Sequence, residues 1–108
     1  MQLKSKCTVH FLFLDFFFFT TKNTTAKAII QKNLAACVNV VKTESHYKWK
    51  GKLVEDGEFL LIIKTAGKNY KKLESFVKKN HPYELPEIIR VPVTGGLKAY
   101  LDWVLKGA

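Results

Sequence analysis

Residues 80–87, with the sequence NHPYELPE, contain the side chains whose types and spacing are best suited to chemistry. His81 offers an imidazole nitrogen, and Glu84 and Glu87 offer carboxylates further along the same segment. Imidazole combined with carboxylate or thiolate suits Cu(II), Cu(I) or Zn(II) better than Mg(II) or Ca(II). The segment therefore predicts a transition-metal site.

A structural role explains the same residues. A histidine at the C-terminal end of a helix bonds the last free carbonyl groups and complements the helix dipole. Pro82 and Pro86 mark the end of a helix and the start of a strand, with Tyr83 packed in a seam between subunits and Glu87 paired to a lysine. Both interpretations stay open, because a lone histidine does not complete a fourfold ligand set.

Cys37 is a further candidate ligand. It supplies a thiolate to the site if the strand after the first helix lies near the end of the second helix; otherwise it is a small buried hydrophobic residue. Cys7 and Cys37 fit neither a disulfide framework nor a closely spaced zinc pair. Reduced thiols in a cytoplasmic protein are therefore expected.

Two tryptophans are assigned to packing. Tyr47 and Trp49 alternate with lysines along an expected strand, a pattern that could stack single-stranded nucleic acid. Alternation places the aromatic rings on one face and the lysines on the other, so the two groups cannot act on one ligand together. Burial of Trp49 in a subunit interface is the favoured interpretation, and Trp103 packs from the last helix.

The formal net charge is +9, from 18 Lys+Arg and 9 Asp+Glu. The lysines are spread along the chain, and those near residue 70 alternate with apolar residues as on the solvated face of a helix. We therefore expect no nucleic-acid partner. No catalytic triad or phosphate-binding glycine loop occurs, so no enzymatic activity is expected either. Lys64, Arg90 and Lys98 remain candidates for binding a small anion in a cleft between subunits.

The first twenty residues resemble a secretory signal, since lysines precede a phenylalanine-rich run. Asp15 interrupts that run, no small-residue cleavage pattern follows it, and it is too short to span a bilayer. A buried first strand is favoured, and no membrane partner is expected.

Hydrophobic periodicity predicts the order of the elements. The expected elements are a strand in residues 11–19, a turn at residues 20–23, a helix from Thr24 or Thr25 to Ala36, strands in residues 37–41 and 45–53, a turn at residues 55–58, a strand at residues 59–65, a helix at residues 70–79, a strand at residues 88–93 and a last helix carrying Leu97 and Val104. Pro92 predicts that the strand containing it lies at a sheet edge.

This order predicts one α+β domain spanning residues 1–108, a ferredoxin-like split βαβ fold (βαββαβ plus a C-terminal helix) with an antiparallel sheet. The helices then cover one face of the sheet. The strand at residues 59–63 is apolar at every position, so the other face also needs a cover. A partner subunit supplies it most simply, which predicts an oligomer.

Five segments, in order between Ala26 and Val104, resemble the CutA (CutA1) divalent-cation tolerance protein family. They are residues 34–40 (LAACVNV), 47–52 (YKWKGK), 61–65 (LIIKT), 81–89 (HPYELPEII) and 100–103 (YLDW). The resemblance implies a ferredoxin-like subunit in a tight homotrimer, shaped like the PII signalling trimers. It also implies an association with copper and other divalent metals. The expected role is therefore divalent metal binding between subunits, with His81, Cys37 and Glu87 as candidate ligands and copper as the favoured ion. The family is often acidic, whereas this chain is basic.

Overall fold

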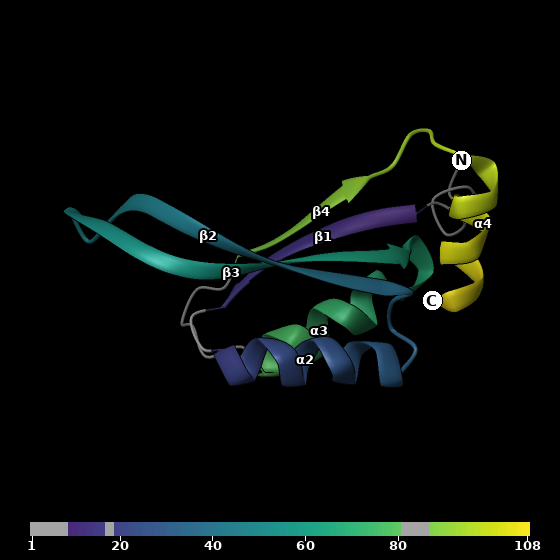
Figure 1. The fold of residues 1–108 in the computed structure, drawn as a ribbon, viewed down its shortest axis with the longest axis horizontal. Helices are drawn as coiled ribbons and strands as arrows, with labels where there is room; N and C mark the ends of the chain where they lie inside the picture. The colour runs from purple at the N-terminus through teal and green to yellow at the C-terminus, as the bar shows by residue number, and fades with distance from the viewer. Residues whose placement is uncertain (1–8, 17–18, 81–86) are drawn as a thin grey trace.

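An antiparallel sheet with two helices on one of its faces forms the body of the protein (Figure 1). The computed structural model describes residues 9–16, 19–80 and 87–108. Its elements are β1 (Val9–Phe16), α2 (Phe19–Gln31), β2 (Cys37–Trp49), β3 (Lys52–Ala66), the 3-10 turn η1 (Gly67–Asn69), α3 (Tyr70–Asn80), β4 (Ile88–Pro92) and α4 (Lys98–Gly107). The α+β class predicted from the sequence is confirmed.

The strand order is β2-β3-β1-β4, with every neighbouring pair antiparallel. The apolar strand predicted at residues 59–65 lies inside the sheet, between β2 and β1. β4 forms an edge, as Pro92 predicts, since proline lacks the N–H that an interior strand must donate. Residues 9–16 of the phenylalanine-rich segment form the interior strand β1, whereas Phe19, which was predicted to belong to this strand, lies in α2. None of the helices in the described ranges is long and apolar enough to cross a bilayer.

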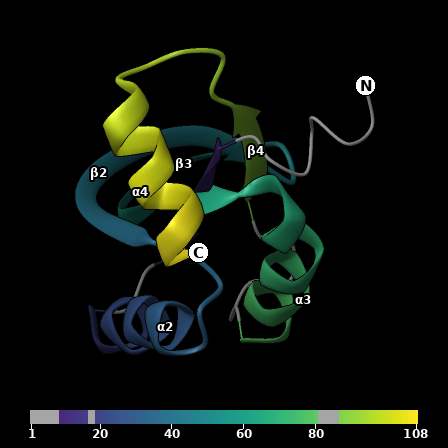
Figure 2. The ribbon, with the colours of Figure 1, turned by 90° about the vertical axis from the view of Figure 1, so that its right-hand side faces the viewer.

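The core lies between the sheet and the helices α2 and α3 (Figure 2). Alternate residues of β3 face the helices, so Leu61 and Ile63 are fully buried against Ile29 of α2 and Leu73 of α3. Each such side chain contributes about 1.5–3 kcal/mol through its removal from water. α4 lies apart from this layer, at one end of the sheet, where its Val104 is buried.

The opposite face of the sheet carries no helix along most of its length (Figure 1). By the strand register, this open face presents Leu60 and Ile62 of β3, Val41 of β2, and Ile89 and Val91 of β4. Val41, Ile89 and Val91 are exposed. An apolar sheet face of this kind is the feature from which the sequence predicted an oligomer.

The helix α2 begins and ends earlier than predicted. Residues 20–23 belong to the helix and form no turn, so that prediction was wrong. The helix ends through a Schellman motif: Asn33 has φ 57°, its N–H donates to Ile30 O at 3.0 Å, and the N–H of Leu34 donates to Ile29 O at 3.0 Å. The predicted helix ran on to Ala36, although asparagine is a residue type that ends helices in this way.

The hairpin joining β2 and β3 turns at Lys50 and Gly51, whereas the sequence predicted a turn at residues 55–58. Both residues have a positive φ, 51° and 78°. The two-residue hairpin turn whose twist matches that of the flanking strands requires positive φ at both positions. Residues 55–58 continue β3, and Glu58 is 6% exposed, with Ser45 donating to its carboxylate at 3.3 Å.

This hairpin extends well beyond the body of the sheet (Figure 1). Residues 43–49 and 52–58, which we call the arm, pair only with each other, because β1 reaches no further along β3 than Phe59. The principal extents are 43 × 27 × 23 Å, and the Cα radius of gyration is 14.7 Å. A compact chain of this length would have a radius of about 13 Å. The arm therefore accounts for an elongated subunit.

Candidate functional site

Several predicted site residues lie in the segment between α3 and β4. His81, Tyr83, Pro82 and Pro86 fall outside the described residues, as does Glu84. The structure defines only the ends of this segment: α3 ends at Asn80, and the exposed Glu87 immediately precedes β4. The predicted ligands His81 and Glu87 thus belong to the connection between the end of α3 and the start of an edge strand.

Cys37 lies far from Glu87 in the same chain. It opens β2 at the end of the sheet where β3 finishes, opposite Lys64, and Lys64 is in register with Val91 through β1. Three strand spacings separate Cys37 from Val91, and four residues along the strand separate Val91 from Glu87. With ordinary sheet dimensions the two candidate ligands are about 20 Å apart. One subunit therefore cannot bring Cys37 and Glu87 to a single metal ion.

The two residues nevertheless occupy opposite edges of the sheet. Cys37 begins the edge strand β2, and Glu87 leads into the edge strand β4. Edges with unpaired backbone groups are the places where sheets of separate chains join. If the β2 edge of one copy meets the β4 edge of another, residues that are distant in one chain become neighbours across the seam.

The thiol of Cys37 is half-buried and donates a long hydrogen bond to Asn39 Oδ1, with Sγ and Oδ1 3.8 Å apart. Lys64 is its direct cross-strand partner on the open face. The thiol is thus accessible at the sheet edge, in contrast to the fully buried small residue that the alternative interpretation required.

A histidine that the sequence analysis did not single out lies on the arm. His46 Nε2 is 3.7 Å from Glu44 Oε1, and His46 Nδ1 is 3.7 Å from Glu55 Oε1. The two carboxylates face different ring nitrogens, so one ion cannot be held by all three side chains. Among the described residues, no group of three His, Cys, Asp or Glu side chains is arranged to hold a metal. The contact with Glu55 depends on the turn at Lys50 and Gly51, which the sequence placed elsewhere.

The aromatic residues assigned to packing are exposed in the single chain. Trp49 is 42% exposed at the tip of the arm, and Trp103 of α4 is 52% exposed, stacked on Tyr100 with ring centroids 5.8 Å apart. Tyr47 donates its hydroxyl to Asp56 Oδ2 at 3.1 Å. Burial of either tryptophan therefore requires a second chain.

The three cations considered for anion binding do not converge. Lys64 Nζ lies 5.7 Å from the centroid of the Tyr100 ring, and Arg90 Cζ lies 4.3 Å from that of Tyr70. Lys98 Nζ pairs with Asp102 Oδ2 at 2.8 Å, and this hydrogen bond raises the pKa of Lys98. By the strand register, Lys64 and Arg90 point to opposite faces of the sheet. A cleft containing all three cations is absent from a single chain.

Tyr70 has a pKa above its ordinary value. Burial is the largest cause, followed by the hydrogen bond that its hydroxyl donates to the Glu74 carboxylate and by the negative charge of Glu74. Arg90 over the ring opposes the shift. This cluster joins the start of α3 to β4 and fixes the helix above the sheet.

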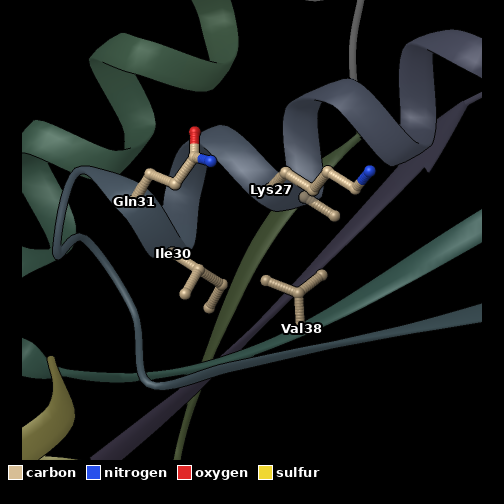
Figure 3. A pocket seen from close by; sticks show the side chains of 5 residues that line it. Lys27, Ile30, Gln31 and Val38 are labelled. Carbon is tan, nitrogen blue, oxygen red and sulfur yellow. The ribbon is translucent and has the colours of Figure 1, made fainter.

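An apolar hollow lies between α2 and β2 (Figure 3). Ile30 points from the helix toward Val38 of the strand, and Ala26, Lys27 and Gln31 complete the lining. None of these residues carries a thiol, imidazole or carboxylate, so the hollow does not suit a metal ion.

The fold and the edge positions of the candidate ligands define an α+β protein with an open sheet face and two unpaired edges. A sequence profile described as "CutA1 divalent ion tolerance protein" matches residues 18–107. The chain therefore belongs to the CutA1 divalent ion tolerance protein family.

Relatives share about half of the residues in the matched region. The divalent-cation tolerance protein CutA of Thermus thermophilus is 48% identical over 82 residues, which is 75% of this chain and 80% of that protein. Protein CutA of Homo sapiens is 48% identical over 80 residues, 73% of this chain. The aligned part is only 45% of the human protein, so the chain matches less than half of that relative's length.

Solved structures agree with the fold. The structure of CutA1 from Thermus thermophilus gives a TM-score of 0.87 at 39% identity, covering 92% of this chain and 97% of that one. CutA1 from Oryza sativa gives a TM-score of 0.89 at 38% identity, with 95% of each chain covered. At these sequence identities, the likeness extends to the sequence as well as to the fold.

Proposed function

We propose that the chain is a ferredoxin-like subunit of a homotrimer that binds divalent metal ions, copper foremost, and contributes to divalent-cation tolerance. The observation that carries this proposal is family membership, since the matched profile covers residues 18–107 and the bacterial relative is named for divalent-cation tolerance. The βαββαβ element order and the strand order β2-β3-β1-β4 support the subunit fold. No enzymatic activity forms part of the proposal.

The metal site is proposed between subunits. His81 is the principal ligand, with Cys37 and Glu87 as further ligands. The separation of about 20 Å between Cys37 and Glu87 in one chain excludes a shared site within a subunit. Their positions at opposite sheet edges support a site where the edges of two copies meet. A soft thiolate beside an imidazole favours copper over the harder divalent ions.

Three surfaces of the subunit support assembly. Among the described residues neither edge strand has a further partner, the open face exposes Val41, Ile89 and Val91, and the arm exposes Trp49 and Leu53. An isolated chain that leaves these surfaces in water risks uncontrolled association, whereas a closed ring of copies covers them. The proposed interface includes Trp49 of the arm, and we extend it to Tyr83, Pro82, Pro86 and Trp103, as expected from the sequence.

Native mass spectrometry with and without Cu(II) tests subunit number and metal stoichiometry together. We expect a trimer with three copper ions, and loss of these ions in His81→Ala. The matched control is His46→Ala, which removes an imidazole from the arm and is expected to leave the stoichiometry unchanged. Cys37→Ser and Glu87→Gln then test the weaker ligands. Copper uptake that survives His81→Ala and falls in His46→Ala would move the site to the arm.

A second function is a PII-like trimer that binds a small ligand or a protein in the clefts between subunits. It is favoured by the absence, within the described part of the chain, of a three-residue metal-binding group. Thermal shift distinguishes the two functions, because a ligand specific for the native state stabilises it increasingly as its concentration exceeds Kd. Stabilisation by a small anion but not by Cu(II) supports the second function.

We also propose a cytoplasmic location, which the accessible, unpaired Cys37 supports. Relatives differ in this respect. The Arabidopsis thaliana relative, 49% identical over 80 residues, is named as chloroplastic, and the Archaeoglobus fulgidus structure is described as periplasmic. Fractionation of cells expressing the full chain tests the location directly.

A further inference from the structure

The layer formed by α2 and α3 is rich in exposed lysines. Seven exposed lysines lie on it, and its two helices contain a single acidic residue. The lysines are Lys27, Lys32, Lys68, Lys71, Lys72, Lys78 and Lys79. We call this surface the lysine layer.

Folding gathers these charges from separate parts of the sequence. α2 and α3 lie side by side beneath the sheet in both views (Figures 1 and 2). Lys32, just beyond α2, places Nζ 5.6 Å from the centroid of the Phe76 ring of α3, which links the two helices directly. The sequence-based expectation of no nucleic-acid partner rested on lysines spread along the chain; in the fold, these lysines lie on or next to two neighbouring helices.

The lysines of α3 lie on the side of the helix that faces away from the sheet. Leu73 and Val77 are buried against the sheet, and Lys71 and Lys78, seven residues apart, lie on the opposite side of the helix. Glu74 is the one carboxylate of the layer, and it already accepts the hydroxyl of Tyr70. Among the described residues, no ion pair neutralises any of the seven lysines.

We propose that the lysine layer binds the phosphate backbone of double-stranded nucleic acid without sequence specificity. α3 has 11 residues and is therefore about 16 Å long. A duplex carries one phosphate charge per about 1.7 Å of its axis, so a segment of this length presents roughly ten negative charges. Five exposed lysines on the two adjacent helices, with Lys32 and Lys68 next to them, supply a comparable positive charge.

Among nucleic acids, the residue types of the lysine layer favour the backbone of a duplex as the partner. Single strands are bound on aromatic platforms, and the exposed aromatic residues of the described chain lie on the arm and α4. Base recognition relies strongly on arginine, whereas this layer contains only lysine, which acts as a point charge on phosphate. We therefore expect the layer to bind duplexes of any base sequence.

A lipid surface fits less well. Binding at a membrane interface needs an apolar helix face that enters the boundary region, and here Ile29, Leu73 and Val77 are buried in the core. Among the helix residues whose burial is described, Ile30 is the exposed large apolar one, and it points toward Val38 across the hollow of Figure 3. The open sheet face, which the proposed trimer covers, lies on the other side, so assembly leaves the layer accessible.

The test is fluorescence anisotropy with a labelled DNA duplex of about 24 base pairs and the full chain. With about five phosphate contacts, raising salt from about 50 to about 200 mM lowers affinity about 500-fold, because log K falls by about 0.9 per contact for each unit of log salt. The layer variant carries Lys71→Glu and Lys78→Glu. The control carries Lys48→Glu and Lys52→Glu on the arm, which change the net charge equally.

We expect the layer variant to lose at least about tenfold more affinity than the arm variant, with a salt slope smaller by about two. Circular dichroism confirms that both variants fold, since all four lysines are exposed. Equal loss in the two variants overturns the proposal, because net charge alone then explains binding. Salt-insensitive binding, or retention by vesicles rich in anionic lipid without binding to the duplex, overturns it as well.

Discussion

Thr65 is the buried hydroxyl that ties the connection after α2 to the sheet. Its side chain is fully buried, and Oγ1 donates to Leu34 O at 2.7 Å. We expect Thr65→Val, which keeps the volume but leaves this carbonyl unpaired, to lower the free energy of unfolding by about 1–2 kcal/mol. The matched control is Thr43→Val, whose hydroxyl makes a 3.4 Å bond to Glu58 O on the arm and should cost less. Urea unfolding measures both, and an equal cost would contradict the role of Thr65.

Tyr70 gives the protein a specific alkaline sensitivity. Its pKa in the folded state is raised by burial and by Glu74, so the neutral phenol is favoured by folding. This contribution is fully present below the ordinary tyrosine pKa of 10.0 and is lost as pH rises through the higher folded-state pKa. We expect Tyr70→Phe to reduce the fall in unfolding midpoint between about pH 9 and about pH 11. Between about pH 7 and about pH 9 the wild type and the variant should keep a constant difference, since the phenol stays protonated. A constant difference up to about pH 11 would contradict the raised pKa.

The hairpin turn is set by the backbone of Lys50 and Gly51. Gly51 has φ 78°, a conformation that costs a residue with a Cβ about 1 kcal/mol, although no atom would contact the added Cβ. We therefore expect Gly51→Ala to destabilise the protein by about 1 kcal/mol, measured by urea unfolding. Gly57→Ala is the control, because Gly57 on the same arm lacks a positive φ and also has open space around it. If both variants cost the same, the turn conformation is not the cause.

The elements that the sequence predicted well are those with strong periodicity. The apolar run at residues 59–65 and the helical spacing of apolar residues in α3 both lie where they were predicted, and Pro92, which lacks a backbone N–H, correctly indicated that β4 is an edge strand. The wrong boundaries occur where backbone conformation decides: Asn33 ends α2, and Lys50 adopts a positive φ without being glycine. Asparagine is one of the residue types enriched at positive φ, so Asn33 is a signal that the sequence contains, whereas the residue type of Lys50 gives none.

The candidate site was predictable only in its residue types. Imidazole, thiolate and carboxylate indicate a metal from sequence alone, but the separation of Cys37 from Glu87 follows from strand register. Strand register also brings His46 next to Glu55, a contact that the residue pattern of neither strand predicts. The lysine layer has the same origin, because helix packing alone brings Lys32 over Phe76.

The subunit distributes its surfaces so that the two proposed interactions do not compete. The open sheet face and the sheet edges are suited to other copies of the chain, and the lysine layer lies on the opposite side of the sheet (Figure 2). The arm, which raises the radius of gyration above that of a compact chain, projects aromatic residues that one chain cannot bury. Assembly and polyanion binding can therefore occur together, and multiple copies of the layer strengthen binding to a long duplex through multivalency.

In the proposed assembly, the open sheet face is covered by other copies of the chain. Val41 on the edge strand β2 and Val91 on the edge strand β4 are exposed on this face, so a carboxylate at each position is tolerated in the single chain. In an assembly that covers the face, the same carboxylates are buried without a partner, which costs several kcal/mol for each charge. We therefore expect Val41→Glu with Val91→Glu to convert the oligomer to monomer in analytical ultracentrifugation, whereas Ser75→Glu on the outer side of α3 leaves it intact. A double variant that remains oligomeric places the interface elsewhere, on the arm or α4, because a covered sheet face cannot accept two unpaired charges.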